Sequence, residues 1–279
     1  MMSTSPAQTP PEPAPEATFV AADTPKTGRH GPAWIAHLHL ATAFLTRFPV
    51  PEVCMDAAGS LAASMSAFPV VGSAIGLMGG VVYLIAAKFL PFLPAALLAV
   101  TATILITGAL HEDGLADLAD ALGARGGKDK RLEIMRDSRI GTFGALALIL
   151  SVGIRATALS SLPSGLAGLA ALTAAGALSR ALLPVLYQFL PPARTDGIAA
   201  SGGVPEVSVA AKAALAGLVL AFAAGGFTLA ASAALGAIIG ATIVGFTAKR
   251  AIGGYTGDVL GAAQQAAECG ALIAAAALW

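Results

Sequence analysis

The chain has 279 residues, of which 56% are hydrophobic and only 11% are charged, and its mean hydropathy is +0.78. Because a soluble domain carries about 25% charged residues, this composition excludes an ordinary water-soluble protein and indicates an integral membrane protein. The sixteen basic and sixteen acidic residues cancel, which argues against a chain-wide basic surface for nucleic acid.

The first 32 residues differ from the rest of the chain. They hold seven of the seventeen prolines, and they lack the basic start and apolar stretch of about 7–15 residues that a signal peptide requires. We expect a disordered tail at 1–32 and one membrane-embedded domain at 33–279. The two cysteines, Cys54 and Cys269, match no metal or redox spacing and are expected to be inert.

Apolar segments long enough to cross a bilayer follow along the chain. A hydrocarbon core of about 30 Å needs roughly 20 apolar residues as a helix. The predicted spans are 68–90, 92–110, 141–161, 166–190, 208–224 and 228–248. Two shorter segments flank them: 34–50 is either an interfacial helix or a partial span, and 261–279 together could enter the membrane. The fold class is therefore predicted to be all-α, a polytopic bundle of about six to seven transmembrane helices.

The lengths of the connections place the polar loops on one side. The turns KFLPFLP, SLPSG and AAGG are short, whereas 111–139, 191–207 and 249–258 are long and polar. Alternate crossing therefore puts every polar connection on one face, with these basic residues: Arg125, Lys128, Lys130, Arg131, Arg136, Arg139, Arg194, Lys249 and Arg250. Because cationic loops stay in the cytoplasm, we expect this face to be the cytoplasmic side of a bacterial inner membrane.

The segment HEDGLADLAD, residues 111–120, concentrates acids directly after an apolar run. Asp113, Asp117 and Asp120 stand at i, i+4 and i+7, on one face of a helix. Three such carboxylates repel one another unless cations lie among them, and oxygen ligands favour Mg²⁺ or Ca²⁺. His111 is either a base or metal neighbour, or an interfacial histidine with a water partner. The alternative for the whole cluster is a solvated loop with ordinary charge pairs.

Basic residues follow the acids in KDKRLEIMRDSRIGTFG. Lys130, Arg136, Ser138 and Arg139 are candidate substrate-binding residues, and Asp137, four residues after Glu133, is a further candidate metal ligand. Carboxylates that hold a metal, next to cationic side chains, are the parts of a phosphoryl-transfer site. Gly114 leaves room where a phosphate or metal could approach the backbone.

Two further loops on the same face contribute candidates. ARTDGI offers Arg194, and the glycine-rich GGYTGD offers Thr256 and Asp258. A glycine-rich turn that leads into a helix can bind phosphate, although a flexible linker is the default interpretation. Arg155 and Arg180 lie inside predicted spans, where they either steer phosphate or pair with an acid for packing.

Six segments together resemble the adenosylcobinamide-GDP ribazoletransferase (cobalamin synthase) family. They are FLTRFPVP at 44–51, FPVVGSAIG at 68–76, HEDGLADLADALG at 111–123, RLEIMRDSRIGTFGALAL at 131–148, SRALLPVL at 179–186 and GGYTGDVLGA at 253–262. The resemblance implies an Mg²⁺-dependent enzyme that joins adenosylcobinamide-GDP to α-ribazole or its 5′-phosphate and releases GMP. It makes 33–279 a catalytic domain, and it leaves open a homo-oligomer or a complex with other biosynthetic enzymes.

The resemblance also implies roles for the acidic segment. Asp113, Asp117 and Asp120, together with Glu112, would hold Mg²⁺ against the diphosphate, and one carboxylate would take the proton of the ribazole 3′-hydroxyl. The charge of the leaving GMP would be neutralised by Mg²⁺ and by basic groups such as Lys130, Arg136 or Arg139. The chain departs from the family pattern at Gln265, where a glutamate is common, while Glu268 matches. We expect position 265 to be peripheral.

Two other functions compete with this interpretation. CDP-alcohol phosphotransferases also use aspartates at helix ends, but their signature has Ala-Arg where this chain has Ala116-Asp117. A secondary transporter would place its coupling acids near the middle of the bilayer, whereas these acids cluster at its edge.

Overall fold

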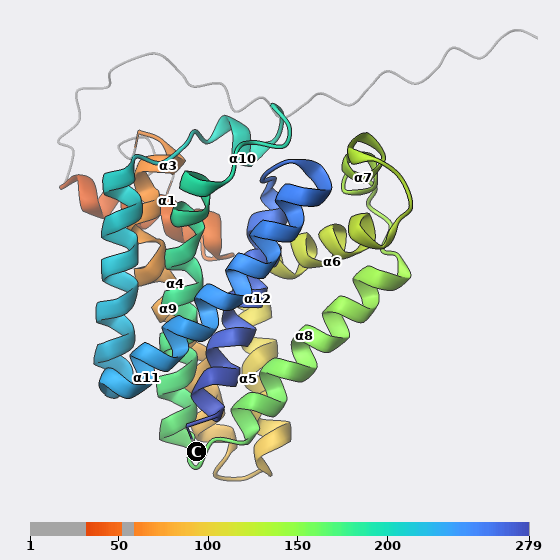
Figure 1. Ribbon diagram of the computed structural model, residues 1–279. Coiled ribbons are helices and arrows are strands. Elements are labelled where there is room, and N and C mark those ends of the chain that lie inside the picture. The colour runs from red at the N-terminus through yellow and green to blue at the C-terminus, as the bar shows by residue number, and fades with distance from the viewer. Residues whose placement is uncertain (1–31, 52–58, 279) are drawn as a thin grey trace, which may run out of the picture. The chain divides into compact units, whose positions relative to one another are not determined.

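The computed structural model describes residues 32–51 and 59–278 (Figure 1). The predicted tail lies outside the described residues except for Pro32, and so does Cys54. In the described part of the chain the regular structure is helical, with one isolated bridge between Pro192 and Tyr255. The all-α prediction is confirmed.

The helices are α1 (Ala33–Leu45), α3 (Leu61–Ser64), η2 (Met65–Ala67), α4 (Phe68–Ala86), α5 (Phe92–Thr107), α6 (Leu110–Gly123), α7 (Lys128–Ile134), α8 (Thr142–Ser160), α9 (Gly165–Phe189), α10 (Ile198–Ser201), α11 (Val207–Ile252) and α12 (Gly257–Ala276). By length and apolar composition, α4 with the turns before it, α8, α9, α11 and α12 can each cross a membrane. The helix α5 passes the same test only together with α6. Every predicted span therefore has its helix, and 261–279 lies almost wholly in α12.

A glycine pair divides α11 into the two crossings that the sequence predicts. Gly225 and Gly226 have non-helical backbone angles, and Gly226 lies in the left-handed region at φ +77°, which glycine adopts without steric cost. Figure 1 shows the two halves of α11 running in opposite senses from this kink. The 46 residues thus supply a descending and an ascending helix.

A second break separates α5 from α6. Gly108 and Ala109 both have positive φ, +65° and +61°, and the two helices are bent by 94°. The left-handed region costs a non-glycine residue about 1–2 kcal/mol, so Ala109 is held there by the packing around it. The bend turns α6 across the bundle, and we treat α6 as lying outside the membrane-spanning segments.

Close helix packing accounts for many of the glycines. A Cβ on Gly72 of α4 would overlap the carbonyl oxygen of Gly176 in α9, and one on Gly236 of α11 would overlap that of Gly270 in α12. Small residues allow membrane helices to approach in this way. These glycines are therefore packing residues.

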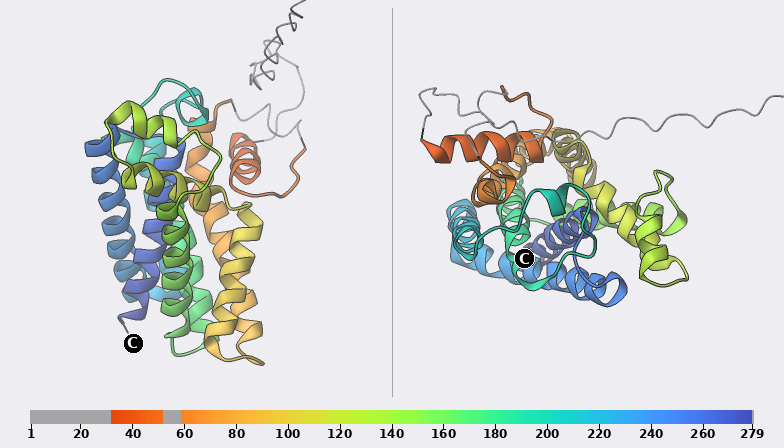
Figure 2. Two further views of the ribbon diagram at one scale, coloured as in Figure 1. Left: turned by 90° about the vertical axis from the view of Figure 1, so that its right-hand side faces the viewer. Right: turned by 90° about the horizontal axis from the view of Figure 1, so that it is seen from above.

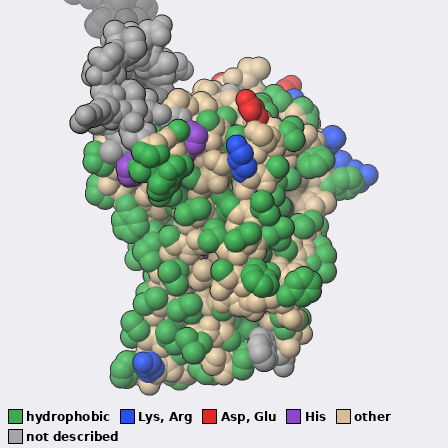
Figure 3. Space-filling model, turned by 90° about the vertical axis from the view of Figure 1, so that its left-hand side faces the viewer, with side chains coloured by type: hydrophobic (Ala, Val, Ile, Leu, Met, Phe, Trp, Pro, Cys, Tyr) green, Lys and Arg blue, Asp and Glu red, His purple; other side chains and the backbone are tan. Residues whose placement is uncertain are grey.

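The polar connections lie together at one end of the bundle, as predicted. Figures 1 and 2 show α7, α10 and the α11–α12 junction at this end, while the α4–α5 and α8–α9 turns and the C-terminus lie at the other. Between the ends, large apolar side chains such as Leu215 and Ile243 are more than half exposed, and Figure 3 shows one such flank covered mainly by hydrophobic groups. Exposed apolar surface of this extent fits a lipid environment.

Candidate functional site

The acidic face of α6 lies against the start of α12. A Cβ on Gly114 would come within 2.8 Å of the Cα and carbonyl oxygen of Asp258. The missing side chain at Gly114 therefore lets the backbone of α12 approach α6, and Gly114 also lines the cavity where a phosphate or metal is expected. The contact brings Asp113 and Asp258 to the same cavity.

Replacing Gly114 by alanine is expected to destabilise the protein by about 1–3 kcal/mol, since a Cβ would push apart two packed backbones. The matched control is Gly153→Ala in α8, where an added Cβ meets nothing within 4 Å. Thermal unfolding in detergent measures both variants. Equal melting temperatures for the two would contradict the close approach of α6 and α12.

The two further loops also meet at this point. Tyr255 donates its N–H to the carbonyl of Pro191 at 2.9 Å and accepts from the N–H of Ala193 at 2.8 Å. The guanidinium of Arg194 lies 3.6 Å from the carboxylate of Asp258. Polar segments far apart in sequence were predicted to lie together on one face. This prediction is confirmed for α6, 191–197 and 253–258, which contact one another.

Thr256 caps the N-terminus of α12. Its hydroxyl accepts from the N–H of Val259 at 3.2 Å and donates to Asp258 at 3.3 Å, which makes Thr256 the N-cap of α12. The glycine-rich turn is thus the start of a capped helix and not a flexible linker. The N-terminus of α12, which is the positive end of the helix dipole, lies at the cavity that Thr256 and Asp258 line.

Carboxylates outnumber cations around Asp117. The charges that act on this half-buried side chain are those of Asp113, Asp258 and Asp120, with Arg194 as the opposing charge. Among the described residues, no three histidine, cysteine, aspartate or glutamate side chains are arranged to hold a metal ion. Because Mg²⁺ needs only one or two carboxylates when substrate phosphates complete its shell, Asp113 and Asp117 with Asp258 nearby still fit this ion.

Asp120 faces another helix. Its carboxylate accepts from the N–H groups of Gly141 at 2.7 Å and Gly144 at 2.8 Å, so it caps the N-terminus of α8 from outside that helix. A Cβ on either glycine would overlap the carboxylate. This capping accounts for Asp120 and for both glycines of SRIGTFG, and we do not retain Asp120 in the proposed cation site.

The variant Asp120→Ala is expected to lower the free energy of unfolding by about 1–2 kcal/mol, because two N–H groups of α8 lose their acceptor. Asp120→Asn keeps one acceptor oxygen and should fall between this variant and the wild type. Chemical or thermal unfolding in detergent ranks the three proteins. If Asp120→Ala unfolded like the wild type but lost cation binding, Asp120 would be a ligand after all.

Glu112, one residue before Asp113, points into the bundle. Its Oε1 accepts from Arg155 and from Gln265, each at 3.1 Å. Arg155 also pairs with Glu268 at 3.3 Å, and Glu268 pairs with Arg180. All four charged side chains are buried. An ion-pair network therefore accounts for Glu112, and Arg155 and Arg180 pair with acids as the packing alternative predicts.

Gln265 belongs to the same network. It donates to Glu112 and to Gln264, and it accepts from the hydroxyl of Ser151 at 2.9 Å. The side chain is 1% exposed. The expectation that position 265 is peripheral is wrong, because a local pattern does not show that α12 packs its polar residues against α6 and α8.

The basic residues around α7 are engaged mainly with nearby acids. Lys130 pairs with Glu133 at 3.0 Å and Arg139 with Asp137 at 2.6 Å, while Arg136 reaches Asp196 at 2.5 Å. The bonds from Arg139 lower the pKa of Asp137 to about 2. This pairing accounts for the Asp137 carboxylate without a metal. Lys130, Ser138 and Arg139 are exposed. None of these three side chains lines the cavity that contains Asp113 and Asp258.

His111 is 3% exposed and lines the cavity, and its Nδ1 has no hydrogen-bond partner among the described residues. The imidazole is therefore available to a group inside the cavity. Its position beside Asp113 keeps it in the candidate site.

The cavity has an apolar wall that the sequence did not single out. Its volume is about 360 Å³, and its apolar lining includes Phe44, Leu61, Met65, Phe68 and Tyr187. These residues come from α1, α3, η2, α4 and α9. The only sequence signal for them is that Phe44 and Phe68 begin two of the segments that resemble the family.

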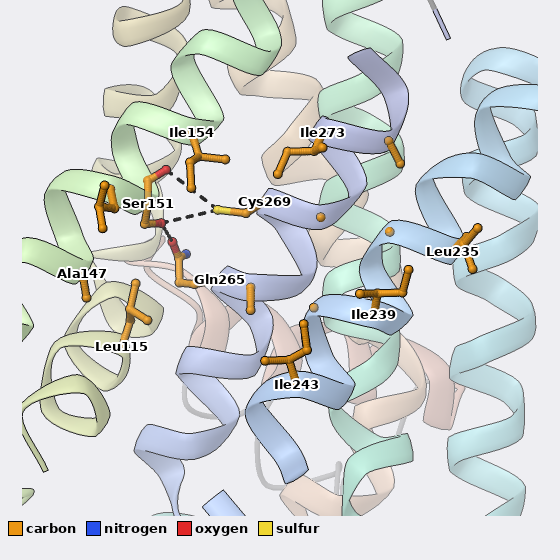
Figure 4. Close-up of a pocket in the computed structure, with 16 residues that line it drawn as sticks. Leu115, Ala147, Ser151, Ile154, Leu235, Ile239, Ile243, Gln265, Cys269 and Ile273 are labelled. Atoms are coloured by element: carbon orange, nitrogen blue, oxygen red, sulfur yellow. Dashed lines mark hydrogen bonds between the residues drawn. The ribbon is translucent and has the colours of Figure 1, made fainter. Parts of the chain in front are cut away.

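A second cavity lies elsewhere, among α6, α8, α11 and α12 (Figure 4). It has a volume of about 540 Å³ and an almost wholly apolar lining that includes Ile154, Ile239 and Ile243. Its polar groups, Ser151 and Gln265, are bonded to each other. No charged side chain of the described residues lines this cavity, so it is no candidate for phosphate chemistry.

Comparison with known proteins gives a consistent result. The CobS family, described as Cobalamin-5-phosphate synthase, matches residues 37–276. Two similar proteins are named adenosylcobinamide-GDP ribazoletransferase. That of Bradyrhizobium diazoefficiens is 46% identical over 246 residues, covering 87% of this chain and 94% of the relative. That of Mesorhizobium japonicum is 44% identical over 244 residues, covering 85% and 91%. No solved structure matches the chain. With its match over nearly the whole membrane domain, the chain belongs to the Cobalamin-5-phosphate synthase family.

Proposed function

We propose that the protein is an adenosylcobinamide-GDP ribazoletransferase. It transfers the adenosylcobinamide phosphate group from adenosylcobinamide-GDP to α-ribazole, or to α-ribazole 5′-phosphate, and releases GMP. This is the nucleotide-loop assembly step of cobalamin biosynthesis. The observation that carries the proposal is the cavity whose lining includes Asp113, Asp258 and Arg194, in a chain of this family.

The reaction exchanges one phosphorus–oxygen bond for another. The 3′-hydroxyl of α-ribazole attacks the phosphorus that is bonded to cobinamide, and the bond from this phosphorus to the GMP phosphate breaks. The proton of the hydroxyl passes to a carboxylate of Asp113 or Asp117, or to His111. The guanidinium of Arg194, which lines the cavity, would stabilise the negative charge of the diphosphate. Arg136 is a second cation close to the cavity, because it forms a salt bridge with Asp196, which also lines it.

Asp113 and Asp117, with Asp258 beside them, are the residues that would hold Mg²⁺. The ion would neutralise charge on the diphosphate when bound. The support for this assignment is the excess of carboxylates around Asp117, which costs stability unless a cation joins them.

The site is proposed to face the cytoplasm of a bacterial cell from its inner membrane. The support is the group of arginine and lysine residues in the loops at the same end of the bundle as the cavity.

The experiment is a GMP-release assay on the protein purified in detergent or liposomes. GMP is expected only when adenosylcobinamide-GDP, α-ribazole and Mg²⁺ are all present, and EDTA should abolish its release. If the folded protein released no GMP under these conditions, or released it equally without α-ribazole, the proposed transfer reaction would be wrong.

A further inference from the structure

The cavity at the acidic face is lined by two chemically different groups of residues from different elements. The apolar group includes Phe44 and Phe68, whose rings are stacked at 5.8 Å between centroids, and Tyr187, which packs against Tyr255 at 4.5 Å. The charged group consists of Asp113 on α6, Arg194 and Asp196 in the 191–197 loop, and Asp258 on α12. A ligand that contacts both groups would combine a compact apolar ring system with hydroxyl groups.

The volume of the cavity limits the size of that ligand. About 360 Å³ is near the lower end of the range of about 300–1,000 Å³ for small-molecule sites. A benzimidazole ring with its ribose fits a space of this size. A corrin macrocycle with its amide side chains does not. The guanosine of adenosylcobinamide-GDP is of similar size, but the polar edges of its base would lie unpaired against the apolar lining. The volume and the lining together therefore favour α-ribazole.

His111 supplies an independent reason to expect a polar ligand there. The imidazole is 3% exposed, lines the cavity and leaves Nδ1 without a partner among the described residues. A buried nitrogen without a hydrogen bond costs about 1–3 kcal/mol. A ligand hydroxyl or ring nitrogen at this place would remove that cost.

We infer that this cavity is the α-ribazole subsite. The dimethylbenzimidazole ring lies against Phe44, Met65 and Phe68, and the ribose is directed toward His111 and Asp113. The corrinoid stays outside the cavity and presents its diphosphate at the rim. This inference rests on the proposed function for the identity of the nucleoside.

The test separates the binding of the two substrates. Leu61 belongs to the apolar group and is half-buried, so Leu61→Trp fills the cavity with less disturbance than a change at the fully buried Met65. The matched control is Ile239→Trp, which adds the same side chain to the other cavity at a position that is 51% exposed. Binding of radiolabelled α-ribazole is measured by equilibrium dialysis without the corrinoid, and KM is measured for each substrate.

Leu61→Trp is expected to weaken α-ribazole binding and raise its KM by about tenfold or more, which corresponds to roughly 1.4 kcal/mol. The KM for adenosylcobinamide-GDP should stay within about twofold, a change of less than roughly half a kcal/mol. Ile239→Trp should change neither value. His111→Phe keeps an aromatic ring of similar size but removes both ring nitrogens, and it should weaken α-ribazole binding in a protein that still folds.

Three results would overturn the inference: no saturable binding of α-ribazole to the folded wild type, unchanged binding in folded Leu61→Trp, or a rise only in the KM for the corrinoid. If GMP is released normally while one of these results is found, the proposed function stands and the subsite is wrong. If α-ribazole binds here and Leu61→Trp blocks it, but no GMP is released, the subsite stands and the proposed reaction is wrong.

Discussion

Asp117→Asn is expected to reduce the rate of GMP release by roughly 100-fold or more without destabilising the protein. The loss of a metal ligand or of the proton acceptor removes several kcal/mol of transition-state stabilisation. The free energy of unfolding should stay the same or rise, because the change removes one negative charge from a place where Asp113, Asp258 and Asp120 repel it. A residue kept for function at a cost in stability shows this combination.

The matched control is Asp129→Asn, an exposed acid at the start of α7 in the same polar connection. It should affect neither GMP release nor unfolding. Steady-state assays and thermal melts in the same detergent provide both readouts. Normal GMP release by Asp117→Asn, or a loss of activity that only follows a loss of folded protein, would remove Asp117 from the site.

Glu268→Gln is expected to destabilise the protein by roughly 3–5 kcal/mol, because it leaves two buried arginines with one carboxylate between them. Glu268 pairs with Arg155 and Arg180 and also accepts from Gln264 at 2.7 Å. The network joins α6, α8, α9 and α12, so its loss should also displace α6 and reduce GMP release. Thermal and SDS-induced unfolding measure the effect on stability.

A second variant tests whether buried charge is the cause. In Glu268→Gln/Arg180→Met the remaining pair, Glu112 with Arg155, is neutral again, and much of the lost stability should return. The exposed acid Glu133, paired with Lys130, provides the control Glu133→Gln, which should leave unfolding unchanged. A double variant that is less stable than Glu268→Gln would show that hydrogen bonding and packing, and not unbalanced charge, hold the network together.

The extent to which the site could be predicted differs from residue to residue. Asp113 and Asp117 were identified because a spacing of four residues is a local property of a helix. Arg194 and Asp258 were identified because alternate crossing places their loops at the same end. Thr256 lines the cavity and also caps α12, a role that the sequence did not predict because no feature of its loop distinguishes a cap from a phosphate contact.

The acids to which the structure gives another partner owe it to contacts between distant segments. Glu112 and Asp113 are adjacent in sequence, but successive helical side chains point about 100° apart, so Glu112 meets Arg155 and Asp113 meets the cavity. Asp120 continues the same stripe as Asp117, yet the start of α8 takes its carboxylate. Neither partner is visible in the segment HEDGLADLAD itself.

Composition and residue spacing are enough to predict the membrane class, the positions of the crossings, the common end of the polar loops and the acidic stripe. These follow from apolar length and from the 3.6-residue period of a helix, which are local quantities. Which acids line the cavity, which join the helices of the bundle, and which aromatic residues share the cavity with Asp113 depend on tertiary packing. Those features arise where α6 is turned across the bundle by the bend at Gly108 and Ala109, and packing among separate helices sets that bend.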